Sequence, residues 1–96
     1  MSPLNKKKLT VIRKKLDKLD NSLISIIKKR TVLVKKVLEL KKNKSEIVDK
    51  NRIKKILFNI RKKSLKNKID PRITNRIWKN MIWSYIDYER RNFKKK

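Results

Sequence analysis

The chain has no cysteine, no histidine and no glycine among its 96 residues. Without cysteine it has no disulfide and no thiol nucleophile, and without cysteine or histidine the usual zinc sites and Ser-His-Asp triads are excluded. Gly-rich loops that hold phosphates are missing as well. Any catalysis must use Arg, Lys, Asp, Glu, Ser, Thr or Tyr, and we expect no metal and no cofactor.

Acidic residues are scarce, with 8 Asp and Glu against 32 Lys and Arg and a formal net charge of +24. Such a charge attracts nucleic acid and other polyanions non-specifically. Abundant Lys, Asn and Ile also follow from codon bias toward adenine and thymine, without any binding role. A basic coiled-coil protein that binds nucleic acid is therefore one alternative, and salt-sensitive binding would identify it.

Long apolar runs are absent as well. No stretch of roughly 18 apolar residues could span a membrane, and the opening Met-Ser-Pro-Leu-Asn-Lys has no apolar run of signal length. We expect a soluble, cytoplasmic protein that forms a single domain over residues 1–96.

The main feature present is an apolar stripe with three- and four-residue spacing between residues 9 and 41. No glycine and no internal proline interrupts residues 4–42, so a helix of up to about 39 residues and about 55 Å is predicted. A compact domain of this size is only about 32 Å across, so a second chain must cover the stripe. We expect an intertwined, two-fold homodimer. The stripe consists of Leu9, Ile12, Leu16, Leu19, Leu23, Ile26, Leu33, Val37 and Leu40.

Arg30 interrupts this stripe. A buried unpaired charge costs several kcal/mol, so Arg30 is interpreted either as a binding residue or as a polar residue that sets the helix register. Lys41 lies about 20° around the helix and about 16 Å along it, so the two cations could hold opposite ends of a small anion. Arg13 is about 40 Å from Lys41 and could reach that anion only from an antiparallel partner chain.

Two shorter helices are predicted after a polar connection over residues 42–50. The first, over residues 50–65, follows the N-cap Asp49, and the second, over residues 71–93, follows the start signal Asp70-Pro71. The fold class is therefore all-α, with three helices. The inward face of residues 50–65 is predicted to hold Ile53, Ile56, Leu57 and Ile60. That of the last helix is predicted to hold Ile73, Ile77, Trp78, Met81, Ile82, Tyr85 and Glu89, continuing toward Phe93.

Two positions in these helices could carry chemistry. Glu89 follows Tyr85 by one turn on the inward face, where burial favours a protonated carboxyl unless nearby cations outweigh it. Arg52 follows Asp49 by three residues, and the carboxylate could orient the guanidinium. In a chain that is one-third basic, Arg13, Lys41 and Arg52 are each also explained as solvated surface residues.

Together these residues resemble the all-helical chorismate mutases over nearly the whole chain. The resemblance rests on Arg13-x3-Asp17-x2-Asp20, Arg30-Thr-Val-Leu-Val-Lys-Lys-Val, Lys41, Asp49-Lys-Asn-Arg52 and Ile77-Trp-Lys-Asn-Met-Ile with Glu89. It implies an intertwined dimer of three-helix chains with two identical active sites. Arg30, Lys41 and Arg52 of one chain and Arg13 of the other would then surround chorismate, a dicarboxylate.

The resemblance also implies the reaction, a pericyclic rearrangement of chorismate to prephenate in phenylalanine and tyrosine synthesis, which needs no metal, cofactor or nucleophile. Lys41 would donate to the ether oxygen, and Asp49 would act near the ring hydroxyl or steady the cations. Glu89 stands where many relatives have a Gln directed at the same ether oxygen. A carboxylate there would repel the developing charge, so Glu89 would act in its protonated form. Tyr85 is predicted as a further substrate contact.

Ile53 departs from the pattern, because many chorismate mutases have a Glu there that contacts the ring hydroxyl. An aliphatic residue at this position is similar to the isochorismate-pyruvate lyases, which release salicylate and pyruvate through nearly the same cationic pocket. That activity is the second candidate for the site.

Overall fold

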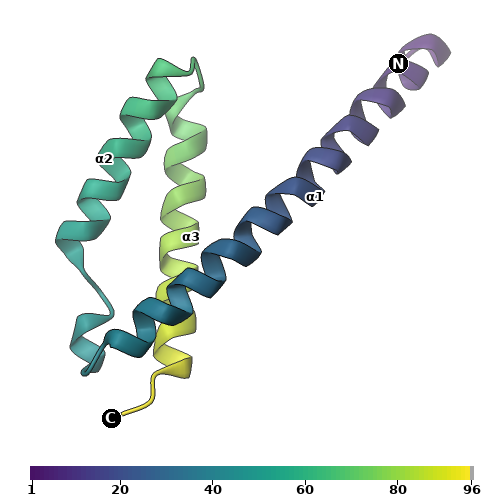
Figure 1. The fold of residues 1–96 in the computed structure, drawn as a ribbon. Helices are drawn as coiled ribbons and strands as arrows, with labels where there is room; N and C mark the ends of the chain where they lie inside the picture. The colour runs from purple at the N-terminus through teal and green to yellow at the C-terminus, as the bar shows by residue number, and fades with distance from the viewer. Residues whose placement is uncertain (96) are drawn as a thin grey trace. The chain divides into compact units, whose positions relative to one another are not determined.

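The computed structural model describes residues 1–95, which form helices joined by short connections (Figure 1). The helices are α1 (Pro3–Leu40), a 3-10 turn η1 (Lys44–Glu46), α2 (Lys50–Lys66) and α3 (Pro71–Asn92). The described residues contain no strand, which confirms the all-α class, and the three predicted helices end within two residues of the observed bounds. Contacts divide the chain into two parts, Met1–Val34 and Lys35–Lys96.

The starts of α2 and α3 follow from capping carboxylates. Asp49 Oδ1 accepts a hydrogen bond from the Arg52 backbone N–H at 3.0 Å, and Asp70 Oδ1 accepts one from the Arg72 backbone N–H at 2.9 Å. Pro71, which has no N–H to satisfy, begins α3. Both predicted helix starts are confirmed.

The turn between α2 and α3 is tight although the chain has no glycine. The Ile69 N–H donates to the Ser64 carbonyl at 2.9 Å, and the Lys68 N–H donates to the Leu65 carbonyl at 3.2 Å. This pair of bonds is the Schellman helix ending, which requires a left-handed residue. Lys68 takes that position with φ 57°.

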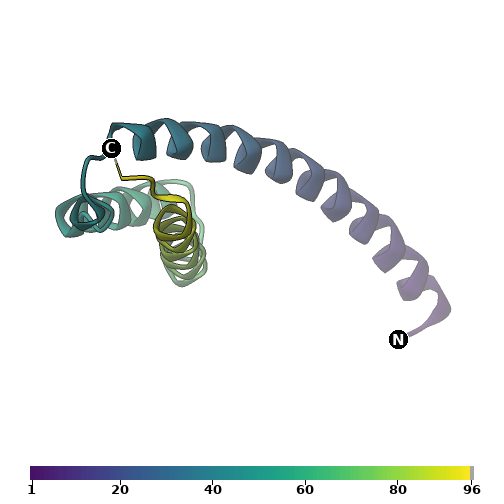
Figure 2. The ribbon, with the colours of Figure 1, turned by 90° about the horizontal axis from the view of Figure 1, so that it is seen from below.

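A small core holds the part Lys35–Lys96 together. Figures 1 and 2 both show α2 and α3 side by side, running in opposite directions. Ile47, from the connection before α2, is buried together with Ile82 and Ile86 of α3. The predicted apolar face of α2 is confirmed, since its four residues are half-buried and most of them pack against this cluster.

The predicted inward face of α3 is partly wrong. Ile73 and Ile77 are 56% and 53% exposed. Each residue advances about 100° around a helix, so the adjacent face turns toward α2 instead. Ile86, which the sequence prediction omitted, is buried on that face at 5% exposure. The inward face runs through Thr74, Trp78, Ile82 and Ile86, at four-residue intervals.

A polar contact joins α2 to α3 near the turn. Ser64 is 3% exposed, and its Oγ lies 2.7 Å from Thr74 Oγ1 and 2.6 Å from the Ile60 carbonyl oxygen. Each hydroxyl has one hydrogen, so Ser64 donates to Ile60, and Thr74 has two acceptors within reach, the Ser64 hydroxyl oxygen and the Pro71 carbonyl oxygen at 3.3 Å. The hydroxyl pair explains why a serine and a threonine lie on the inward faces of the two helices.

The apolar stripe of α1 is exposed. No residue of α1 is buried, and Leu16, Leu19 and Leu23 are 52%, 65% and 53% exposed. Arg30 is exposed as well, and it makes no ion pair with another of the residues described. A partner chain that covers the stripe remains a prediction.

Replacing Ser64 with alanine is expected to lower the free energy of unfolding by about 0.5–1.5 kcal/mol, because the Ser64–Thr74 hydrogen bond is lost while Thr74 keeps the Pro71 carbonyl as an acceptor. Chemical denaturation followed by circular dichroism measures the change. Ser84→Ala is the matched control, since the exposed Ser84 hydroxyl donates to the Asn80 carbonyl of its own helix and forms no hydrogen bond across the helix pair among the described residues. Equal losses in both variants would show that the Ser64–Thr74 contact does not stabilise the helix pair.

Candidate active site

Lys41 and Glu89 form an ion pair between residues that are 48 positions apart in the sequence. Lys41 Nζ lies 3.1 Å from Glu89 Oε1 and 3.2 Å from Oε2, so both carboxylate oxygens accept from the ammonium group. Lys41 directly follows the end of α1, and Glu89 lies in the last turn and a half of α3. The ion pair therefore ties the end of α1 to the end of α3 within the part Lys35–Lys96.

This ion pair is largely removed from water. Glu89 is 5% exposed as a residue, and the side chain of Lys41 is 17% exposed. A buried carboxylate is costly unless it is paired and hydrogen-bonded, and Lys41 satisfies both of its oxygens. The sequence predicted both residues as site residues but not their contact, which only the packing of α3 creates.

Tyr85 lies one helical turn before Glu89 on the same face of α3 and is half-buried. Its position agrees with the predicted face. Tyr85 and Glu89 therefore lie on the same side of α3, the side that turns toward the core. This position is consistent with Tyr85 lining a site next to the ion pair.

Asp49 and Arg52 stand at the start of α2, and both are exposed. The Asp49 carboxylate accepts from the backbone N–H of Arg52. The expected ion pair with the Arg52 guanidinium is not among the ion pairs of the described residues, and the contact between the two residues is the helix cap. A cavity of about 510 Å³ opens beside this helix start, lined by Glu46, Val48, Asp49, Lys50 and Asn51.

The connection between Lys41 and Asp49 is held at two points. Glu46 Oε2 accepts from the Lys42 backbone N–H at 2.9 Å, and the next residue, Ile47, is 3% exposed within the core. Together these contacts fix the chain that separates Lys41 from Asp49. Sequence reasoning missed Glu46, although an acidic residue in an otherwise basic, polar connection was the available signal.

Arg13 and Arg30 belong to the part Met1–Val34 and are exposed on α1. Their predicted place around the same ligand as Lys41 stays a prediction. Of the predicted site residues, the structure brings Lys41 and Glu89 into direct contact, puts Tyr85 on the same face, and sets Asp49 and Arg52 at the start of α2.

The ion pair offers an ammonium donor held in a fixed position, which can stabilise negative charge on an oxygen atom. Within residues 1–95, no group of three or more Asp and Glu is placed to hold a metal ion. Over the same range, none of the helices combines the length and the apolar character that crossing a bilayer requires.

Comparison with known proteins identifies the family. A model of the family "Chorismate mutase type II" matches residues 12–90, a range that contains every predicted site residue from Arg13 to Glu89. Comparisons with curated proteins and with solved structures gave no match. The family match covers most of the sequence and agrees with the three-helix, strand-free fold of the described residues. The chain belongs to the chorismate mutase type II family.

Proposed function

We propose that this protein is a chorismate mutase that rearranges chorismate to prephenate for phenylalanine and tyrosine synthesis. The observation that carries the proposal is the buried Lys41–Glu89 ion pair inside the range of the family match. These are the two residues that the sequence resemblance assigns to the ether oxygen of the substrate.

The reaction breaks one C–O bond and forms one C–C bond within a single molecule. It needs no nucleophile, so catalysis consists of holding the reactive conformer and stabilising negative charge on the ether oxygen. Lys41 Nζ is suited to that task because Glu89 holds the ammonium group in a partly buried position. A donor fixed in advance needs little reorganisation as the charge develops.

Glu89 must be protonated to help Lys41. An ionised carboxylate would repel the charge that develops on the ether oxygen, whereas a neutral carboxyl can donate a hydrogen bond to it. A neutral carboxyl still accepts a hydrogen bond from Lys41 through its carbonyl oxygen, so the ammonium group stays in place beside the substrate. The active form therefore has a charged Lys41 and a neutral Glu89.

The two carboxylates of chorismate require further cations. Arginine binds planar carboxylates through two parallel hydrogen bonds, which suits Arg30 and Arg52 of one chain and Arg13 of a second. Asp49 would act near the ring hydroxyl, and Tyr85 would contact the substrate from α3.

The exposed stripe of α1 supports a homodimer with shared active sites. Apolar side chains along the helix lack cover within their own part of the chain, and burying them against a second α1 is favourable. An antiparallel two-fold pairing would carry Arg13 of one chain toward the Lys41 end of the other.

Ile53 favours a second candidate activity, that of an isochorismate-pyruvate lyase. Its side chain is half-buried and packs against the core cluster of Ile47, Ile82 and Ile86. An aliphatic group there offers no hydrogen bond to a ring hydroxyl, in line with the lyases that the sequence resembles at this position. Salicylate fluorescence from isochorismate, without consumption of chorismate, would establish the lyase.

The purified protein is expected to consume chorismate and form prephenate, measured by the loss of chorismate absorbance. Lys41→Ala is expected to lower kcat by about 10²–10³, the usual cost of losing a donor to a developing anion. Lys41→Gln, which retains a hydrogen-bond donor, is assayed beside it, with circular dichroism as the test of folding. Lys42→Ala is the control, because Lys42 orders its connection through its backbone N–H. A folded, inactive wild type would overturn the proposal.

Replacing Glu89 tests its role. Glu89→Gln is expected to keep activity within about ten-fold of the wild type, because an amide can hold Lys41 through its oxygen and donate to the ether oxygen, whereas Glu89→Ala, which can do neither, is expected to lower kcat by about 10²–10³. Initial rates of the two variants measure both effects. Asp87→Asn is the control, since the exposed Asp87 pairs only with Arg91 among the described residues. Equal losses in Glu89→Gln and Glu89→Ala would defeat this assignment.

Mixing two inactive variants tests the shared site. Arg13→Ala and Arg30→Ala are each expected to be inactive, because each removes a cation from both sites of its own dimer. After unfolding and refolding together, half the dimers would be mixed, each with one intact site, so about a quarter of wild-type activity should return. If no activity returns although the mixed dimers form, both arginines serve the same chain's site and the shared arrangement is wrong.

A further inference from the structure

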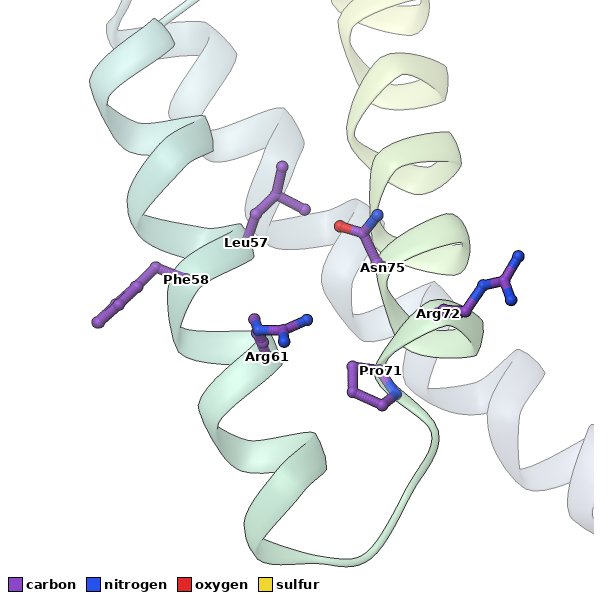
Figure 3. Close-up of a pocket in the computed structure, with 6 residues that line it drawn as sticks. All are labelled: Leu57, Phe58, Arg61, Pro71, Arg72 and Asn75. Carbon is purple, nitrogen blue, oxygen red and sulfur yellow. The ribbon is translucent and has the colours of Figure 1, made fainter.

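A second cavity lies at the turn that joins α2 to α3, at the other end of α3 from Glu89. Its volume is about 330 Å³, and it is lined by Leu57, Phe58, Arg61, Pro71, Arg72 and Asn75 (Figure 3). Pro71 and Glu89 are 18 positions apart on α3, which corresponds to about 27 Å at 1.5 Å per residue. The cavity is therefore separate from the Lys41–Glu89 site.

Two cations and an amide give the cavity its polar side. In Figure 3, Arg61 reaches from α2 toward α3, Asn75 points from α3 toward α2, and Arg72 extends outward at the edge. No acidic residue lines the cavity, and neither arginine is in an ion pair with any residue between 1 and 95. The nearby Asp70 carboxylate instead caps α3 through the backbone N–H of Arg72.

The opposite side of the cavity is apolar. Leu57 and Pro71 are half-buried and form its inner wall, and the exposed ring of Phe58 lies at the rim. Lys62 Nζ lies 5.4 Å from the centre of that ring but does not line the cavity. A polar, cationic side next to an apolar wall suits a ligand that has both an anionic group and an apolar group.

We propose that this cavity is a second binding site, for a small organic anion in which a carboxylate is joined to an aromatic ring through a short linker. Arg61 and the Asn75 amide bind the carboxylate, Arg72 adds attraction at the edge, and the ring lies against Leu57 and Pro71. Arginine suits a planar carboxylate because its guanidinium donates two parallel hydrogen bonds. The site does not depend on the reaction proposed above.

Titration of the full-length protein with phenylacetate, followed by calorimetry or by amide chemical shifts, tests the site. Phenylacetate is expected to bind more tightly than acetate, which lacks the ring, and than phenylethanol, which lacks the charge. The shifts are expected at the α2–α3 turn. Absence of binding, or equal binding of phenylacetate and acetate, would overturn the proposal because the apolar wall would then contribute nothing.

Three variants locate the ligand. Arg61→Gln is expected to weaken phenylacetate binding by about 10- to 150-fold, the range for losing a hydrogen bond to a charged group, and Asn75→Ala is expected to weaken it less. Arg76→Gln is the matched control, because Arg76 follows Asn75 on α3 but does not line the cavity. It is expected to bind as the wild type does.

Two results would contradict the site. Binding that survives in Arg61→Gln but disappears in Lys41→Gln would place phenylacetate at the other site. A change in the sedimenting mass of Arg61→Gln without ligand would place this side chain between two copies of the chain, which would then occupy the cavity.

Discussion

The apolar stripe of α1 is the constraint on which this protein depends. The helix carries a leucine, isoleucine or valine at almost every third or fourth position, yet none of its residues is buried. Burial stabilises by about 25 cal/mol for each Å² of apolar surface, and the rest of the chain has few sources of it, with Ile47, Ile82 and Ile86 as the buried apolar residues described. The proposed homodimer would therefore supply both the missing burial and the proposed shared site, through the covering of α1 by a second copy.

Within Lys35–Lys96, the small core does more than stabilise the fold. Ile86 is buried one turn before Glu89, and Glu46 and Ile47 hold the connection that follows Lys41. These contacts position the ammonium and the carboxyl before any substrate arrives. A reaction that needs a placed charge rather than a nucleophile can be carried by such a pair, which fits a chain without cysteine and histidine.

The sequence predicted the helices well because the signals for them are local. Asp49 and Asp70 cap helices through their own neighbouring backbone, so each start is visible within a few residues. The inward face of α3 was harder to predict, because apolar residues lie on more than one side of that helix. The inward side also includes the polar Thr74, which bonds to Ser64 across the helix pair. Packing between distant segments decided that face.

In the candidate site, too, single residues could be predicted from the sequence, whereas contacts between distant residues could not. The unusual positions of Lys41 and Glu89 were visible in the sequence, but their contact joins residues 48 positions apart and needed the structure. The cavity formed by Arg61 and Asn75 had no signal in a chain so rich in basic residues. Basic residues are common in this chain, so their number does not indicate a binding site. Their placement beside apolar walls or carboxylates is the better indicator.

The most direct test of the central claim is sedimentation equilibrium of the wild-type protein over a range of concentrations, with helix content followed in parallel. The account predicts a particle of twice the chain mass, and loss of helix as dilution separates the two copies. A fully helical, stable species with the mass of one chain would contradict it.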